Sequence, residues 1–184
     1  MNWIKQYIAG MVLFCLCLSG QSMAQKYKSI SSSVHFFSDA PMEDIEATNV
    51  SGHSALDLST NGIVFSIPIA GFEFEKSLMQ EHFNENYMES DKYPQSTFKG
   101  RLSGFDPGIK SWQEAKAEGV MYIHGEENSI SVTGQIKIEG DQIEIEAMFP
   151  VALENYKIKI PKVVFYNIAE IVDVTVSFKY EKID

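Results

Sequence analysis

The sequence predicts an all-β fold of seven or eight antiparallel strands with one short helix, on the basis of three observations. Apolar and polar side chains alternate over most of the chain, as they do in strands with one buried face. The opposite face of these strands is polar, which is typical of antiparallel sheets rather than of buried parallel ones. Short turn signals separate the runs, and Gly140-Asp141 is expected to join residues 135–139 and 142–148 as a hairpin.

The alternating runs follow one another along the chain. The apolar positions of the early runs are Ile30, Val34 and Phe36, then Ile63, Phe65, Ile67 and Ile69. Those of the later runs are Ile130, Val132, Ile136 and Ile138, then Ile143, Ile145, Ala147, Phe149 and Val151, and finally Val172, Val174, Val176, Phe178 and Tyr180. Strands in this number close as a barrel or stack as a sandwich, and the pattern alone does not choose between the two.

One region has helical rather than strand periodicity. Within residues 75–88, Leu78, Met79, His82 and Phe83 recur at helical spacing, which predicts a helix from Ser77 to Met88 that is capped near Ser77. A second, weaker helical patch is expected at residues 111–116, beside Trp112.

The first 24 residues have the pattern of an export signal. They contain Lys5, an apolar run over residues 8–18 and the small-x-small sequence Ser22-Met23-Ala24. The run is well short of the ~20 apolar residues that span a bilayer. We therefore expect residues 1–24 to be a signal peptide, residues 25–184 to form a single domain, and the protein to be periplasmic or secreted.

The composition excludes several classes of function. The chain has 15 basic and 25 acidic residues, a net charge of −10, and loss of Lys5 with the leader makes this −11. Such a surface repels nucleic acids and anionic lipid headgroups. Cys15 and Cys17 both lie in the leader, so the mature domain has no thiol for a disulfide, a metal site or catalysis.

Candidate catalytic and metal-binding residues are few. The four histidines, at positions 35, 53, 82 and 124, have no metal-ligand spacing, and we expect no metal and no cofactor. His82 shares a helix face with apolar residues, which is consistent with a polar contact for a ligand or with a hydrogen bond to a nearby loop. No nucleophile elbow or phosphate-binding loop occurs in the sequence. We therefore expect a protein that is not an enzyme.

Four motifs follow one another along the chain: Ser32-x-Val34-x-Phe36, His82-Phe83 followed by residues 92–98 (KYPQSTF), residues 119–125 (GVMYIHG) and residues 149–158 (FPVALENYKI). In this order they resemble the YceI-like family of periplasmic lipid- or polyisoprenoid-binding proteins. It departs from the family pattern at Met79, where an arginine is common, and at Tyr122, where a threonine is usual. The resemblance implies an extended, lipocalin-like antiparallel β-barrel of about eight strands whose lumen holds an isoprenoid chain.

This resemblance leads to a hypothesis about function and site. The protein would bind, sequester or carry an apolar lipid, an isoprenoid or quinone-like chain, in the barrel lumen without changing it covalently. The residues expected in the lumen or at its rim are Val34, Phe36, Phe65, Phe72, Phe74, Leu78, Met79, His82, Phe83, Tyr87, Phe98, Phe149 and Val151. Phenylalanine and methionine suit such a wall because they offer adaptable apolar contact.

Two alternatives stay open from the sequence. The first is a ligand-free structural or interaction domain of the cell envelope with a filled barrel, and the second is a hydrolase or isomerase built on His82 and a carboxylate. Lumen volume distinguishes the carrier from the filled barrel. A homodimer and an envelope protein partner are both compatible with the sequence, whereas a nucleic-acid partner is not.

Overall fold

The computed structural model describes residues 25–39, 44–160 and 169–183. The expected signal peptide, residues 1–24, lies outside these ranges. No helix in the described ranges has the length and apolar character needed to cross a membrane.

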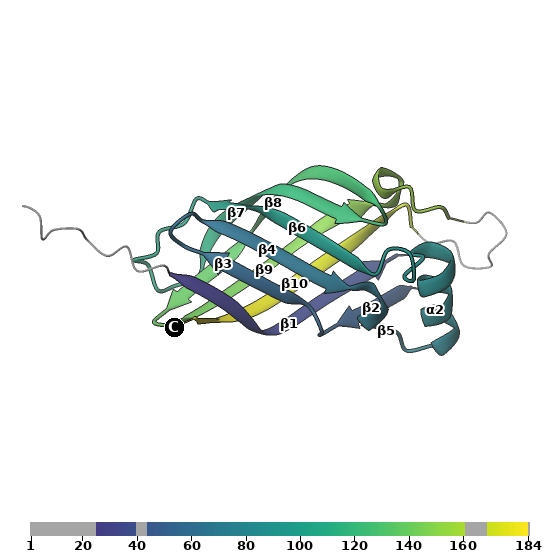
Figure 1. Ribbon diagram of the computed structural model, residues 1–184, viewed down its shortest axis with the longest axis horizontal. Coiled ribbons are helices and arrows are strands. Elements are labelled where there is room, and N and C mark those ends of the chain that lie inside the picture. Colours follow the sequence, from purple (N-terminus) through teal and green to yellow (C-terminus); the bar gives the residue numbers. More distant parts are fainter. Residues whose placement is uncertain (1–24, 40–43, 161–168, 184) are drawn as a thin grey trace, which may run out of the picture.

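Within the described residues, ten strands form one antiparallel sheet that closes on itself, because β10 pairs with both β9 and β1. Figure 1 shows the strands running obliquely around an elongated barrel. The strands are β1 (Lys26–Ser38), β2 (Ile45–Asn49), β3 (His53–Asp57), β4 (Gly62–Pro68), β5 (Phe72–Glu73), β6 (Gln95–Ser103), β7 (Gln113–Ile123), β8 (Glu126–Glu139), β9 (Gln142–Ala152) and β10 (Ile171–Lys182).

The ten strands make an eight-strand barrel because two positions of the wall are each filled by a broken strand. β1 pairs with β3 near its start and with β2 near its end, so β2 and β3 together occupy one position. β4 pairs with β3 and β5 pairs with β2, so β4 and β5 share the next position, interrupted by the short helix η2 (Ile69–Gly71). The predicted barrel of about eight strands is therefore confirmed.

A β-bulge in β1 changes which residues of that strand face inward. Ser29 pairs with Tyr180 and Ser31 with Lys179, so Ile30 is the extra residue between them. Before the bulge Tyr27 is buried, and after it Val34 is buried. Ile30, expected on the apolar face, is instead 52% exposed, because alternation does not continue across a bulge.

The predicted helix is present but differs from a single α-helix. α2 (Ser77–His82) is followed by a π-helical turn, η3 (Phe83–Tyr87), in which the Met88 amide donates to the Phe83 carbonyl. The N-cap residue is Lys76 rather than Ser77, and no side chain caps the helix. Figure 1 shows α2 at one end of the barrel, opposite the C-terminus.

Two other local predictions have opposite outcomes. The turn at Gly140-Asp141 joins β8 to β9, as expected, with Glu139 opposite Gln142. The helical patch expected at residues 111–116 is wrong, because β7 begins at Gln113 and pairs with both β6 and β8. Pairing of residues 113–116 with β8 overrides their weak helical propensity.

The end of the barrel away from α2 is filled by side chains. Tyr180, Ile136 and Ile143 are fully buried there, and the Tyr180 hydroxyl lies 2.7 Å from the Ser54 hydroxyl. Ser54 donates its own proton to the Val64 carbonyl, so Tyr180 is the donor to Ser54. Burial raises the pKa of Tyr180 well above its usual value.

Candidate functional site

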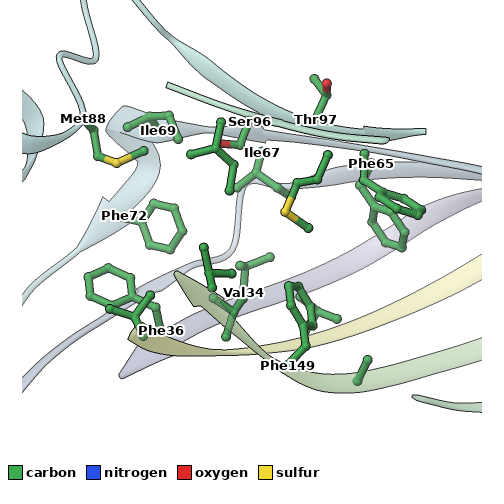
Figure 2. Close-up of a pocket in the computed structure, with 18 of the residues that line it drawn as sticks. Val34, Phe36, Phe65, Ile67, Ile69, Phe72, Met88, Ser96, Thr97 and Phe149 are labelled. Atoms are coloured by element: carbon green, nitrogen blue, oxygen red, sulfur yellow. The ribbon is translucent and has the colours of Figure 1, made fainter. Parts of the chain in front are cut away.

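The rest of the barrel interior contains a cavity of about 240 Å³. This is many times the roughly 10–15 Å³ that one water molecule requires. Among the described residues that line it, none carries a charge, and the hydroxyls of Tyr87, Ser96 and Thr97 are its only polar side-chain groups. Figure 2 shows labelled side chains from several strands converging on this space.

Eleven of the thirteen residues expected in the lumen or at its rim line this cavity. They are Val34, Phe36, Phe65, Phe72, Phe74, Met79, Phe83, Tyr87, Phe98, Phe149 and Val151. The strand residues among them come from β1, β4, β5, β6 and β9, so strands far apart in the sequence share one wall. Strand alternation accounts for this arrangement because it directs every second side chain inward.

Leu78 and His82 do not line the cavity. Leu78 is 59% exposed on the outer side of α2. The His82 ring accepts a hydrogen bond at Nδ1 from the Asn86 side-chain amide, 2.9 Å away and one turn further along the helix. The expected apolar face is therefore narrower than predicted and consists of Met79, Phe83 and Tyr87.

The helical segment attaches to the barrel through a cluster of phenylalanine rings. Phe83 contacts Phe36, Phe72 and Phe74, with ring centroids 5.6, 5.5 and 5.0 Å apart respectively. The π-helical turn accommodates this contact because it directs both Phe83 and Tyr87 toward the cavity. Burial raises the pKa of Tyr87 above its usual value, so its hydroxyl remains neutral over the ordinary pH range.

Hydrogen bonds connect the segments beyond this cluster. His124, in the β7–β8 turn, donates from Nδ1 to the Tyr156 carbonyl (3.0 Å), and its Nε2 lies 2.9 Å from a Glu89 carboxylate oxygen. The Lys157 ammonium lies 2.8 Å from the Glu126 carboxylate. These contacts join the chain after η3, the β7–β8 turn and the short helix η4 (Leu153–Tyr156). His124, whose side chain is only 9% exposed, is therefore a structural link rather than a simple turn residue.

Several lining residues were not among the candidates from the sequence. Some lie in the alternating runs and could have been found by extending the same pattern: Ile63, Ile67, Ile69, Val132, Ile145, Ala147, Val172, Val174, Val176 and Phe178. Others lie where no clear alternation was recognised: Ile45, Met88, Ser96, Thr97, Leu102, Ala117, Met121 and Ile123. Leu153 continues the alternation of Phe149 and Val151 into η4, whereas Ile158 approaches the cavity from beyond η4, where there is no strand periodicity.

The chemistry of the described residues matches this apolar interior. No group of three or more metal-ligating side chains comes together within the described ranges. His35 is paired with Glu46 on the outside of the barrel, 3.1 Å away. The lining of this cavity offers apolar contact and, among the described residues, no charged partner.

Comparison with known families agrees with this geometry. The YceI-like domain model matches residues 26–180, nearly the whole described chain. The chain belongs to the YceI-like family. No curated protein matches the sequence.

Solved structures related to this YceI-like domain share its fold at low sequence identity. A polyisoprenoid-binding domain from Saccharophagus degradans, implicated in plant cell wall breakdown, has a TM-score of 0.74 and 11% identity over 85% of this chain and 98% of its own. BcnA of Burkholderia cenocepacia has a TM-score of 0.66 and 14% identity, with 80% and 95% covered. The YceI protein of Campylobacter jejuni has a TM-score of 0.57 and 12% identity, with 81% and 82% covered.

Proposed function

We propose that this YceI-like protein binds and carries an apolar lipid, an isoprenoid or quinone-like chain, in its barrel lumen without catalysing a reaction. The observation that carries the proposal is the cavity of about 240 Å³ with its uncharged, almost wholly apolar lining. The polyisoprenoid-binding domain of Saccharophagus degradans, which has the same fold, supports an isoprenoid as the class of ligand.

The energetics of the cavity favour an occupant. An empty apolar cavity costs stability because the side chains around it lack contacts, at about 24 cal/mol per Å³ in core-truncation variants. Water is a poor filling because it needs two to four polar partners. A hydrocarbon chain supplies the missing contacts and gains about 0.8 kcal/mol for each methylene group removed from water.

The lumen volume separates this proposal from the filled-barrel alternative. A ligand-free interaction domain needs no internal space, whereas here only the end around Tyr180 is filled and the end beneath α2 is not. The expected signal peptide and the net charge of −10 support a periplasmic or secreted carrier that meets lipids delivered to it rather than one that adheres to anionic membranes.

Native mass spectrometry of the mature protein, purified from bacterial envelopes and followed by solvent extraction, tests the proposal. We expect a stoichiometric isoprenoid or quinone in the extract. A purely apo mass, together with no uptake of added prenyl lipids, would overturn the carrier function and favour the interaction domain.

A further inference from the structure

Ser96 is a polar residue in the apolar lumen. It lies second in β6, opposite Ile67 of β4 and on the same strand face as the buried Phe98. Figure 2 shows Ser96 beside Ile67, on the side of the strand where the lumen residues gather. Ser96 lies near the α2 end of the barrel. Pro94, just before β6, accepts a hydrogen bond there from the amide of Ile69 in η2.

The Ser96 hydroxyl has no protein partner within the described ranges. Its backbone takes part in the pairing of β4 with β6, but its side chain makes no hydrogen bond there. The neighbouring Ser66 differs, since its hydroxyl donates to the Gln95 side-chain oxygen at 2.6 Å on the outer surface. Ser96 is half-buried at the lumen wall, so a ligand that covers its hydroxyl without bonding to it leaves a polar group shielded from water, at a cost of about 1–3 kcal/mol. A ligand that supplies a partner avoids this cost.

The remainder of the lining restricts what this partner can be. No lysine, arginine or histidine lines the described cavity, so an ionised phosphate would lose its hydration without gaining a counter-ion. An uncharged oxygen, as in an alcohol, a ketone or a quinone, matches a serine hydroxyl without this penalty. Such an oxygen near the α2 end leaves the hydrocarbon tail to extend past Phe65 and Phe98.

We propose that Ser96 binds a neutral oxygen of the cargo and thereby makes the lumen select uncharged, oxygenated isoprenoids. This inference rests on the proposed lipid-binding function and adds the headgroup class and the orientation of the chain. It places the oxygen at the α2 end and the tail toward the filled end.

Two probes of equal chain length test it: farnesol, which has a terminal hydroxyl, and farnesene, which is the corresponding hydrocarbon. Affinities are measured by displacement of a fluorescent apolar dye from the wild-type protein and from Ser96→Ala. Loss of one neutral hydrogen bond predicts roughly a 2- to 10-fold weaker affinity of Ser96→Ala for farnesol, with an unchanged affinity for farnesene. Ser66→Ala, on the outer face, is the matched control and should change neither.

The outcomes separate the two proposals. Equal farnesol and farnesene affinities in the wild type, or equal losses of both in Ser96→Ala, would overturn the role of Ser96 while leaving lipid binding intact. Failure of the wild type to bind either probe would overturn lipid binding and the role of Ser96 with it. Ser96→Thr, which keeps the hydroxyl, should retain the preference for farnesol. Farnesyl phosphate should bind more weakly than farnesol, and tighter binding would contradict the neutral-headgroup inference.

Discussion

Phe36 of β1 and Phe83 of the π-helical turn stack with ring centroids 5.6 Å apart and planes inclined by 16°. The two residues are far apart in the sequence, and both line the cavity. Their contact holds the helical segment against the wall of the barrel. The stability of this segment and the retention of a ligand should therefore depend on the same ring.

Replacing Phe83 with alanine should loosen the helical segment. Because Phe83 is only partly buried, the free energy of unfolding should fall by less than the roughly 3–5 kcal/mol typical of fully buried phenylalanine. Urea denaturation measures this loss, and stopped-flow release of an apolar dye should become faster. Leu78→Ala, on the exposed side of the same helix, should change neither quantity. Equal release rates for the two variants would contradict a role of Phe83 in retention.

The sequence predicts the walls of the barrel better than its ends. Alternation places Phe65, Phe149 and Val151 in one lining because each strand is paired on both sides and cannot rotate. The same rule fails at Ile30, where the bulge shifts the register of β1 by one residue. Nothing in the local sequence marks this bulge, because it depends on the pairing of β1 with β10.

The α2 end of the site is less predictable because tertiary packing determines it. From helical spacing alone, Leu78 and His82 are expected at the lumen just as Met79 and Phe83 are. Which face turns inward depends on the phenylalanine cluster and on the π-helical turn, and neither has a sequence signature. Ile158 was missed for the same reason, since the residues after η4 reach the cavity only through the folded arrangement, whereas Leu153 could have been found by extending the alternation of Phe149 and Val151.

Filling the lumen should abolish binding without unfolding the protein. Ala117 of β7 lines the cavity, and its neighbour Glu118 is exposed on the outer face. In Ala117→Phe the ring occupies existing space, so we expect stability to change by about 1 kcal/mol or less. Apolar dye binding should weaken by at least about tenfold, which corresponds to 1.4 kcal/mol.

Glu118→Phe is the control for Ala117→Phe, because it adds the same ring to the same strand on the opposite face. Its dye affinity should equal that of the wild type. If the two variants bind the dye equally well, the dye occupies the surface of the barrel rather than its lumen.

Asn49 stabilises the region of the barrel wall where β2 and β3 share one strand position and β4 and β5 share the next. It is fully buried, its amide donates to the Pro68 carbonyl at 2.7 Å, and its side-chain oxygen accepts bonds from the Ser51 amide and hydroxyl, both at 2.8 Å. Asn49→Ala leaves these groups without partners, so we expect a loss of about 2–4 kcal/mol in the free energy of unfolding. Ser51→Ala removes only one of the three bonds and should cost about 1 kcal/mol. Equal losses in urea denaturation would show that Asn49 has no role beyond its contact with the Ser51 hydroxyl.

Tyr180 should make the barrel unstable in alkaline solution. Burial holds the pKa of Tyr180 well above its usual value, so the folded protein keeps this proton, while the unfolded chain loses it from about pH 10. Above that pH the unfolded state binds fewer protons than the folded state, and stability falls by up to about 1.4 kcal/mol per pH unit. Burial, with the charge of Asp141, also raises the pKa of Tyr27, which adds to the decline.

Tyr180→Phe removes this titration at the cost of the hydrogen bond to Ser54. The variant should therefore be about 1 kcal/mol less stable than the wild type at pH 8. The difference in stability should shrink or reverse as the pH rises above 10. In the wild type, ionisation of Tyr180 in the unfolded chain favours unfolding at high pH, whereas the variant has no phenol at this position. Urea denaturation of both proteins at pH 8 and pH 11 measures the change, and the titration of lysines common to both cancels in the comparison. A difference that stays constant with pH would mean that the Tyr180 hydroxyl is accessible to solvent in the folded barrel.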